Sequence, residues 1–372
     1  MQNNLSVRTV ACVDNELKLA LDNFVLQHPS GSLYHLSCWL DACERAYKHK
    51  VYRVIVEEQQ QLVGYLPLTV IQPPLAKAKV VAVAFADYCA PLTSTPEVAN
   101  AIEQALKTLM TELGVQQVEI RSSAQQPLED ESLVTQDAVI PSDGTAAALN
   151  TAKVRMIVTL PADANTLLAS YKPKLRSQIK KAAKNGLVFQ RATEHGALKD
   201  FYRIYATNMH RLGSPAHSLG WFEQLVSRVH GEQQFFVALV YCGEQAVGAA
   251  LIFYFQHRAW IPWASTLAQF NHLAPNMLMY WEIQAYLADH GVTEFDMGRS
   301  SLGEGTFRFK QQWGARPYLL DWQCYELSGQ RQTKNHALSK NKLRQLAETV
   351  WQKMPLSVAT FLGSRIRGYI PL

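Results

Sequence analysis

The chain has 372 residues, of which 48% are hydrophobic and 18% are charged. This composition is typical of a folded globular protein, excludes fibrous and disordered classes, and at this length predicts two or three domains. The net charge of +5 permits an acidic partner, such as a nucleotide, tRNA or an anionic membrane face, without requiring one.

Six cysteines are scattered without a Cys-x-x-Cys pair, and the first residues lack the apolar core of a signal peptide. We therefore expect a reduced, cytoplasmic protein without a structural metal. The longest apolar run, 246–255, is too short to span a bilayer and fits a buried strand, so we expect no transmembrane segment.

Taken in chain order, the first part of the sequence predicts strands and helices arranged around a hairpin. The predicted helices are 15–27, 37–47 and 97–113, and the predicted strands are 7–13, 51–57, 62–71, 80–85 and 115–120. Residues 122–151 are rich in Ala, Ser, Asp, Gln and Gly, which indicates a connector with one strand at 134–140.

The second part repeats this mixture and ends in two helices. Its predicted helices are 161–185, 197–212, 219–229, 275–290, 338–354 and 355–369, and its predicted strands are 153–160, 187–192, 235–241, 246–255, 258–264, 294–297 and 323–327. The last helix carries apolar side chains and arginines. Packing on the domain and contact with an anionic membrane both fit this pattern, and packing is the default expectation.

An internal repeat organises the sequence. Residues 114–123 (GVQQVEIRSS) match residues 291–301 (GVTEFDMGRSS) apart from one glycine, and each stretch follows a helix that starts near a proline. Gly64 and Gly248 occupy matching places on the second strand of each hairpin or meander. The order predicts an α+β fold made of two duplicated halves, with domains at 1–150 and 151–330 and a helical extension at 331–372.

Residues 296–314, DMGRSSLGEGTFRFKQQWG, place glycines and cations among hydroxyls and aromatics directly after a short strand. This combination predicts a binding loop for an anionic, partly apolar ligand. The alternative is a basic surface loop with core aromatics.

A second cationic stretch lies at 172–191, which holds seven Lys and Arg residues and no acid. Arg176, Lys180 and Lys184 are spaced as one helical face. Like charges at this spacing destabilise the helix by about a few tenths of a kcal/mol per pair, and a bound anion would offset this repulsion. A solvated helix face and a site for an anion such as an RNA backbone both remain open.

Residues 298–314 resemble the signature region of FemAB-like proteins, in particular the type associated with exosortase/PEP-CTERM systems. Residues 171–182 and 208–218 resemble two further motifs of that family, the second one NMHRLGSPAHS. The resemblance implies a GNAT-superfamily protein with a BioF2-like acetyltransferase domain. Its fold would be two tandem duplicated GNAT-like (acyl-CoA N-acyltransferase) domains, each a mostly antiparallel mixed sheet flanked by helices.

The resemblance further implies an acyltransferase or aminoacyltransferase that acts on an amine of a cell-wall (peptidoglycan) or exopolysaccharide precursor. The donor would be aminoacyl-tRNA or acyl-CoA, with no tightly bound cofactor. A coenzyme A site needs a glycine-rich turn at a helix start, and neither the segment before Glu97 nor that before Asn276 has one, which makes acetyl-CoA the weaker choice. The alternative function is a non-catalytic glycan- or nucleotide-binding component of a polysaccharide assembly system.

Candidate site residues follow from the loop, the repeat and the cationic stretch. Lys310, Asp296 and Arg299 are the predicted catalytic residues, through charge stabilisation and orientation of an amine. The predicted substrate-binding residues are Arg308, Ser300, Gly298, Gly303, Gly305, Trp313, Asp87, Tyr88, His210, Arg211, Arg176 and Lys180. We expect an anionic small-molecule or lipid-linked glycan substrate, with tRNA as a further candidate. We expect a cytoplasmic protein, and peripheral contact with the inner membrane face is the alternative.

Overall fold

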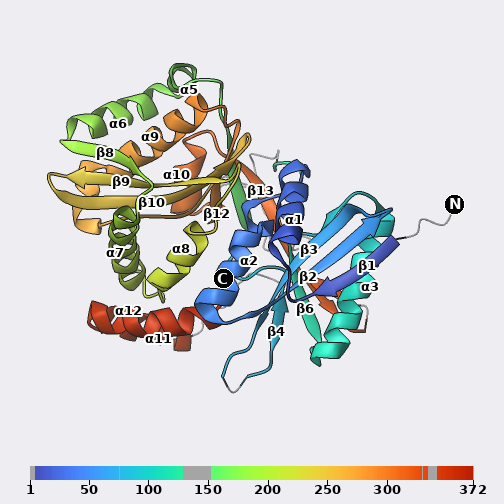
Figure 1. Cartoon of the computed structure of the whole chain (residues 1–372). Helices are drawn as coiled ribbons and strands as arrows, with labels where there is room; N and C mark the ends of the chain where they lie inside the picture. Colours follow the sequence, from blue (N-terminus) through green and yellow to red (C-terminus); the bar gives the residue numbers. More distant parts are fainter. Residues whose placement is uncertain (1–4, 75, 129–151, 329, 334–341, 372) are drawn as a thin grey trace, which may run out of the picture.

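The computed structural model describes residues 5–74, 76–128, 152–328, 330–333 and 342–371. Two lobes lie side by side, each built on a sheet with helices against it, and the C-terminus lies between them (Figure 1). The predicted strand 134–140 lies outside the described residues. The α+β class and the mixed sheets flanked by helices are confirmed.

The first half contains the elements that the hairpin pattern predicted. They are β1 (Leu5–Val10), α1 (Asn15–Gln27), the 3-10 helix η1 (Leu33–His35), α2 (Ser37–Tyr47), β2 (Lys50–Glu58), β3 (Gln61–Ile71), β4 (Lys79–Val81), β5 (Leu92–Thr93), α3 (Pro96–Leu113) and β6 (Gln117–Ser123). The helix starts follow capping chemistry, since the Asp14 carboxylate accepts from the Leu17 N–H and the Thr95 hydroxyl from the Val98 N–H.

The second half follows in the same order of hairpin, strand, helix and strand. Its elements are β7 (Lys153–Thr159), α5 (Ala164–Ser170), α6 (Pro173–Lys184), β8 (Leu187–Ala192), α7 (His195–Arg211), α8 (Leu219–Val226), β9 (Gln234–Cys242), β10 (Gln245–Phe255), β11 (Arg258–Thr266), η3 (Ala268–Leu273), α9 (Pro275–Asp289), β12 (Glu294–Ser301), α10 (Gly305–Gln311) and β13 (Arg316–Glu326). The tail adds β14 (Arg331–Thr333), α11 (Lys342–Lys353), α12 (Leu356–Ile366) and η4 (Arg367–Tyr369).

Several predicted boundaries were wrong. The strand expected at 323–327 begins at Arg316, and three other differences have local reasons. The helical region 161–185 is two helices, because Pro173 starts α6 and Lys172 before it is extended. The strand expected at 80–85 ends at Val81, and Phe85 has a positive φ of 65°. The strand expected to stop at Met297 continues to Ser301, and the segment after its turn is the helix α10, so the predicted binding loop is mostly regular structure.

A single strand, β13, joins the two halves. Leu320 to Glu326 pair with β6 of the first half, and Arg316 to Leu319 pair with β7 of the second. One sheet therefore runs through the molecule in the order β1-β2-β3-β4-β6-β13-β7-β12-β11-β10-β9-β8. The predicted domain boundary at 150/151 falls outside the described residues. The predicted second domain, 151–330, contains β13, although part of this strand pairs with β6 of the first half.

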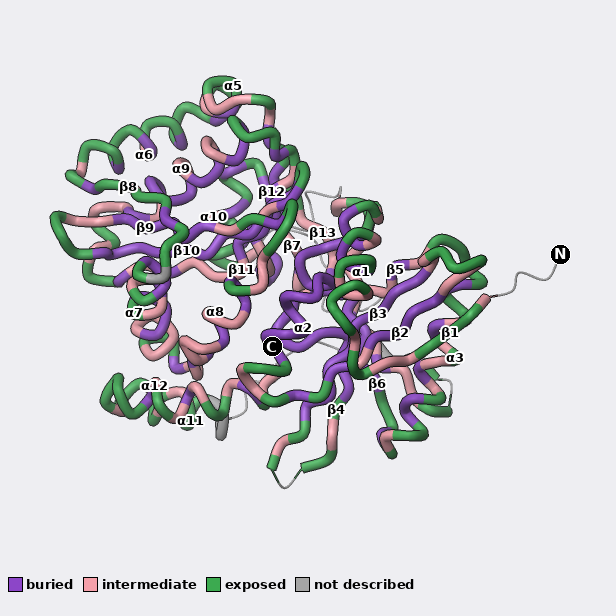
Figure 2. The backbone as a smooth tube through the Cα atoms, viewed as in Figure 1, coloured by how far each residue is buried: buried purple, intermediate pink, exposed green. Residues whose placement is uncertain are grey.

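The duplication is visible in strand pairing. In the first half β4 pairs in parallel with β6, and in the second half β11 pairs in parallel with β12. The buried hydrophobic residues form two cores. Figure 2 shows buried residues in both lobes. The first core extends across the junction, because α2 packs on α8 and Trp39 stacks on Trp263 with ring centroids 5.7 Å apart.

The matched glycines of the repeat lie where a helix approaches the sheet. A Cβ on Gly64 of β3 would lie 2.4 Å from Val98 Cγ1 of α3, and one on Gly248 of β10 would lie 3.6 Å from Pro275 Cβ of α9. Each glycine also adjoins a shift in strand register. Glycine at these positions lets the helix start lie directly on the strand.

We expect Gly64→Ala to lower the free energy of unfolding by about 1–3 kcal/mol, because the added methyl overlaps the stiff Val98 side chain. Gly248→Ala, whose nearest neighbour is 3.2 Å away, should cost less. The control is Gly196→Ala, which meets nothing within 4 Å in helix α7. Urea unfolding of the three variants measures the order, and equal stabilities for Gly64→Ala and Gly196→Ala would contradict it.

Candidate active site

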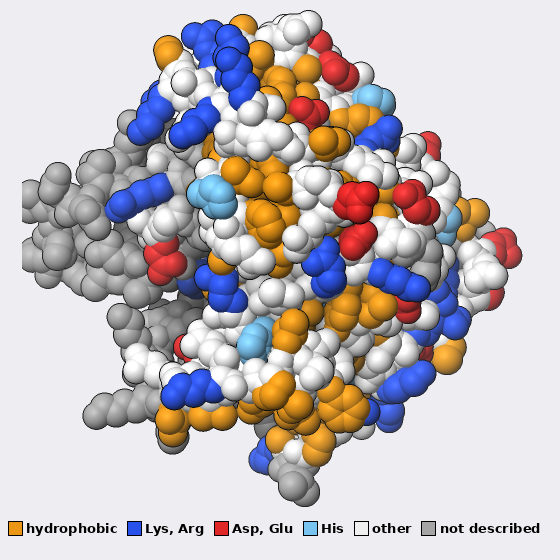
Figure 3. Space-filling view, turned by 90° about the vertical axis from the view of Figure 1, so that its left-hand side faces the viewer, with side chains coloured by type: hydrophobic (Ala, Val, Ile, Leu, Met, Phe, Trp, Pro, Cys, Tyr) orange, Lys and Arg blue, Asp and Glu red, His pale blue; other side chains and the backbone are white. Residues whose placement is uncertain are grey.

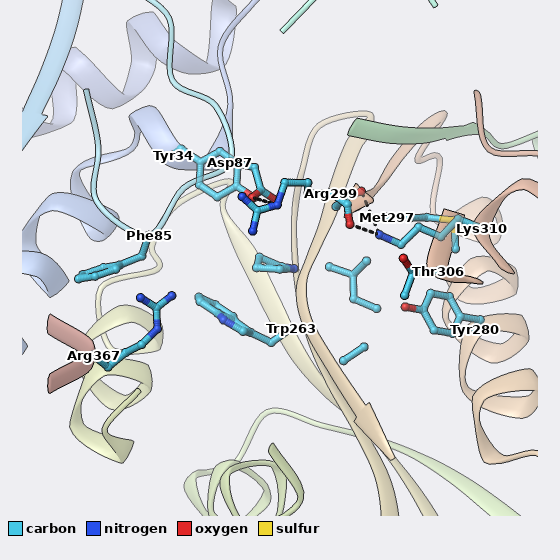
Figure 4. Close-up of a pocket in the computed structure, with 14 residues that line it drawn as sticks. Tyr34, Phe85, Asp87, Trp263, Tyr280, Met297, Arg299, Thr306, Lys310 and Arg367 are labelled. Carbon is cyan, nitrogen blue, oxygen red and sulfur yellow. Dashed lines mark hydrogen bonds and ion pairs between the residues drawn. The ribbon is translucent and has the colours of Figure 1, made fainter. Parts of the chain in front are cut away.

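A pocket of about 350 Å³ lies between the two halves, at the point where β11 and β12 separate. The two strands pair in parallel only over Arg258–Trp260 and Glu294–Asp296. Beyond this point Gly298 has a φ of 75° and the register of β12 with β7 shifts, so β12 turns away from β11. The pocket is lined by Tyr34, Phe85, Asp87, Ile261, Pro262, Trp263, Ala264, Tyr280, Met297, Gly298, Arg299, Thr306, Lys310 and Arg367 (Figure 4).

Asp296 is the buried anchor beneath this pocket. Its carboxylate accepts from Arg155 Nε at 2.7 Å, from the Tyr88 hydroxyl at 3.0 Å and from the Gly298 N–H at 2.8 Å. Trp260 Nε1 in turn donates to the Tyr88 hydroxyl at 2.8 Å. One carboxylate therefore ties β7, the first half and the bulge of β12 together.

The ionisation of the groups around Asp296 follows from burial and charge. Burial raises the pKa of the Tyr88 hydroxyl well above its ordinary value, so it remains a donor. Burial alone would lower the pKa of Arg155, but Tyr88, Asp296 and Glu294 outweigh it and raise that pKa, so the guanidinium stays charged. The cluster is a buried ion pair whose remaining lone pairs are satisfied by hydrogen bonds.

Lys310 closes the floor of the pocket. Its ammonium group donates to the carbonyl oxygens of Gly298 at 3.0 Å and Arg299 at 2.9 Å, which the divergence of the strands leaves available. Burial lowers its pKa from 10.5 to about 8; Asp87 and Asp296 oppose this shift and Arg299 adds to it. Lys310 is therefore able to exist in both protonation states near neutral pH.

Asp87 and Arg299 face each other across the junction of the halves. Arg299 Nε lies 3.5 Å from Asp87 Oδ1, and both side chains are partly exposed. Arg299 also lies over Trp322 at 5.6 Å, while its counterpart in the repeat, Arg121, lies over the same indole at 4.4 Å. The two equivalent arginines thus share one tryptophan, but only Arg299 lines the pocket.

The C-terminal segment supplies one wall. Arg367 of η4 reaches the pocket beside Phe85, with its guanidinium 5.4 Å from the ring centroid, at the opposite end from Lys310 (Figure 4). The segment is held by backbone contacts, since the Phe85 N–H donates to the Pro371 carbonyl at 2.8 Å and His49 Nε2 lies 2.8 Å from the Gly368 carbonyl. The predicted packing of the tail on the protein is therefore confirmed.

Aromatic side chains form the rest of the apolar surface. Phe85 packs edge-on to Trp221 and His217, and Trp263 packs against Trp39. Burial lowers the pKa of His217 well below its ordinary value, so this imidazole is neutral. Flat apolar walls with Arg299, Arg367 and Lys310 suit a ligand that has both an anionic and a planar or apolar part.

Four of the predicted site residues line the pocket: Lys310, Arg299, Gly298 and Asp87. Asp296, Tyr88 and Ser300 lie beneath it and are buried. Gly303, Gly305 and Arg308 lie on the turn and on α10 outside the lining, because α10 points only Thr306 and Lys310 inward.

His210, Arg211 and Trp313 lie outside the lining of this pocket, which corrects their predicted place in it, whereas Arg176 and Lys180 lie on the predicted cationic helix face. Trp313 is fully buried in the second core against Tyr171. His210 Nε2 contacts the Met354 carbonyl at 2.9 Å, and the Arg211 carbonyl accepts from Gln352 Nε2 at 3.0 Å, so both residues contact the tail. Arg176 and Lys180 are exposed on α6. Lys and Arg side chains gather at the top of Figure 3.

The residues that sequence reasoning missed have weak sequence signals. Phe85 looked like a strand residue, and Arg367 looked like part of an amphipathic tail. The sequence could have predicted that Ile261–Ala264 of β11 line the pocket, because ligands bind where parallel strands end and diverge. Among the described residues, no group of three His, Cys, Asp or Glu side chains is placed to hold a metal.

The helix starts do not fit the pyrophosphate of coenzyme A. Before α9 the chain forms the 3-10 helix η3, and the N–H groups of Met277 and Leu278 already bond to the Ala274 carbonyl. Before α3 the Val98 N–H is occupied by Thr95. Neither start presents the run of free N–H groups that a phosphate cradle needs.

The second half matches the family model for an acetyltransferase (GNAT) domain over residues 169–311. The whole chain resembles the crystal structure of FemX with a TM-score of 0.62 at 16% identity, over 92% of this chain and 100% of that one. The chain therefore shares the fold of FemX, and the GNAT domain model matches its second half.

Two further solved structures share this fold. A tandem GNAT protein from the clavulanic acid biosynthesis pathway has a TM-score of 0.51 and 12% identity, over 87% of this chain and 99% of that one. The C-terminal domain of a putative lysylphosphatidylglycerol synthetase from Agrobacterium fabrum has a TM-score of 0.50 and 11% identity, over 82% and 91%. No curated protein matches the chain in sequence.

We expect Asp296→Ala to lower the free energy of unfolding by about 3–5 kcal/mol, because it leaves the buried Arg155 without its main counter-ion. The matched control is Glu57→Ala, which removes an exposed ion pair with Arg8 and should cost at most about 1 kcal/mol. Chemical denaturation measures both, and similar losses would show that Asp296 is not an anchor.

The lowered pKa of Lys310 predicts a pH dependence of stability. Between pH 8 and 10.5 the unfolded chain holds the Lys310 proton more tightly than the folded chain, so the contribution of this residue to stability rises with pH. Wild type should gain about 2 kcal/mol between pH 8 and 10 relative to Lys310→Met, measured by urea unfolding. Exposed Lys199→Met serves as the control, and parallel pH curves for wild type and Lys310→Met would contradict the assignment.

Proposed function

We propose that the pocket between the halves is the active site of an acyltransferase or aminoacyltransferase that acts on an amine. The observation that carries this proposal is Lys310, a buried lysine with a pKa of about 8, at the divergence of β11 and β12. It faces a junction where Asp87 of the first half meets Arg299 of the second. The GNAT model match and the FemX-like fold support the same reaction class.

The reaction needs a neutral amine and a stabilised oxyanion. The amine nitrogen attacks the carbonyl carbon of the donor, and the new C–N bond forms with negative charge on the carbonyl oxygen. Collapse of this intermediate breaks the C–O or C–S bond to the donor, whose leaving group takes the electron pair. The incoming ammonium group first releases one proton to water. When the amide forms, the nitrogen loses a second proton, and the leaving oxygen or sulfur gains one.

The lining residues divide these tasks by charge. Asp87 is the pocket's carboxylate, so it binds and orients the incoming ammonium group before it loses its proton. Lys310 and Arg299 are the cations nearest to it and stabilise the oxyanion. Arg367, at the other end, holds an anionic group of a substrate. Asp296 positions Gly298 and does not touch the substrate.

The donor that fits these features is an aminoacyl ester, such as aminoacyl-tRNA, in preference to acyl-CoA. The starts of α3 and α9 do not suit a pyrophosphate, whereas Phe85 and Trp263 line the pocket with aromatic rings that a base can contact. The basic surface of α6, with Arg176 and Lys180, would then serve a polyanionic donor outside the pocket.

The acceptor in this proposal is an amine on an anionic cell-wall or exopolysaccharide precursor. Three cations and one carboxylate line the pocket, so an acceptor that carries phosphate or carboxylate together with one ammonium group matches its charges. The narrower assignment to an exosortase-associated system rests on the resemblance of residues 298–314 and stays a prediction.

The test is an acyl-transfer assay followed by mass spectrometry of the acceptor. Purified protein is incubated with aminoacyl-tRNA or with acyl-CoA, and with a UDP-muramyl peptide that has a free lysine amine or with a hexosamine. We expect Lys310→Ala to lower kcat/KM at least about 100-fold and Arg367→Ala to raise KM about tenfold, with exposed Lys199→Ala unchanged.

The activity and the unfolding midpoint of Lys310→Met are measured together. A folded variant without activity shows that Lys310 acts in the reaction and not only in folding. Full turnover by a folded Lys310 variant would refute its assigned role. Saturable binding of the UDP-muramyl peptide without transfer from any donor would refute the proposed enzyme and favour the non-catalytic binding function.

A further inference from the structure

The helical hairpin formed by α11 and α12 lies against the second half with one face only (Figure 1). Gly213 packs under Glu348 of α11, and Gly363 of α12 packs on the backbone of Ala216. Gln352 Nε2 also donates to the Arg211 carbonyl at 3.0 Å. The inner faces of both helices are therefore accounted for by α7 and the loop after it.

The outer faces of the same helices are apolar. Of the twelve exposed large hydrophobic side chains in the described part of the chain, seven lie within residues 346–369. They are Leu346, Val350, Leu356, Val358, Phe361, Ile366 and Tyr369, and Leu346 and Phe361 are 61% and 57% exposed. Hydrophobic side chains gather along the lower edge of Figure 3, where the hairpin lies. Such clustering marks an interaction surface.

Charge decides which partner this surface fits. After Glu348 the sequence contains no acid, while Lys353 and Arg365 are exposed among the apolar side chains. Arg365 lies 3.7 Å from the centroid of the Phe361 ring, so the cation and the apolar group share one patch. A second copy of the chain would bring like charges together in a symmetric contact. An anionic lipid surface complements both properties.

We propose that the hairpin of α11 and α12 binds the surface of an anionic lipid bilayer. The apolar side chains enter the headgroup boundary, and Lys353 and Arg365 contact lipid phosphates. Binding is parallel to the surface, because the apolar side chains lie on the outer faces of both helices while the inner faces pack on the protein. Among the described residues, no helix is long and apolar enough to cross a membrane.

The position of the hairpin gives this contact a consequence for the pocket. Arg367, which lines the pocket, follows Arg365 of the outer face by two residues. A docked hairpin therefore holds one end of the pocket close to the lipid headgroups. If the proposed function holds, a lipid-linked acceptor reaches Arg367 without leaving the membrane, whereas lipid binding itself does not depend on that function.

Vesicle co-sedimentation tests the proposal with the full chain and without any substrate. We expect binding to phosphatidylglycerol-containing vesicles that exceeds binding to pure phosphatidylcholine and weakens with salt. The double variant Leu346→Ser/Phe361→Ser should lower the partition coefficient at least about tenfold. The matched control is Leu19→Ser/Val188→Ser, which alters equally exposed side chains far from the hairpin and should bind as wild type.

Lys353→Gln/Arg365→Gln should remove the preference for anionic vesicles while leaving the helices folded, as circular dichroism would verify. Three results would each overturn the proposal: no binding of wild type to anionic vesicles, equal losses in the hairpin and control variants, or a wild-type dimer that the Leu346→Ser/Phe361→Ser change converts to monomer. Acyl-transfer activity with a soluble acceptor, measured separately, is unaffected by the hairpin variants if both proposals hold.

Discussion

The buried carboxylate of Asp296 is the interaction on which the rest of the molecule depends. Arg155 binds it from β7, Tyr88 from the first half, and the Gly298 N–H from the bulge that separates β12 from β11. Because the same side chain joins the lobes and fixes the bulge, the junction and the pocket are set together. The pocket cannot be displaced without breaking a buried ion pair.

This arrangement explains how two copies of one fold came to differ. Arg121 and Arg299 occupy equivalent strands and share Trp322, yet Arg121 is buried and bonds to backbone carbonyls such as Ala86 O. Arg299 keeps part of its surface exposed and faces Asp87. The first copy uses its arginine to hold a loop, and that loop delivers Asp87 to the site of the second copy.

Local chemistry in the sequence predicted the fold well and the site in part. Capping residues, glycine stops and hydrophobic periods marked most helices and strands, and the composition of residues 296–314 placed Gly298, Arg299 and Lys310 in one predicted binding loop. The sequence could not reveal Arg367 or Phe85 as pocket residues, because their positions depend on a contact between the C-terminus and the first half. That contact is the hydrogen bond from the Phe85 N–H to the Pro371 carbonyl, which joins residues 286 positions apart. The predicted place of His210 at the site was wrong for the same reason, since its ring contacts the Met354 carbonyl of the tail.

The sharing of β13 has a consequence for the order in which the chain folds. Strand β6 ends at Ser123, but its partner is the segment up to Glu326, so during synthesis the first half carries an unpaired strand edge until most of the second half has emerged. The Pro371 carbonyl that binds Phe85 emerges later still. Such long sequence separations slow folding and couple the two halves into one cooperative unit. The protein therefore depends most on protection from aggregation during synthesis, when the first half has emerged and β13 has not.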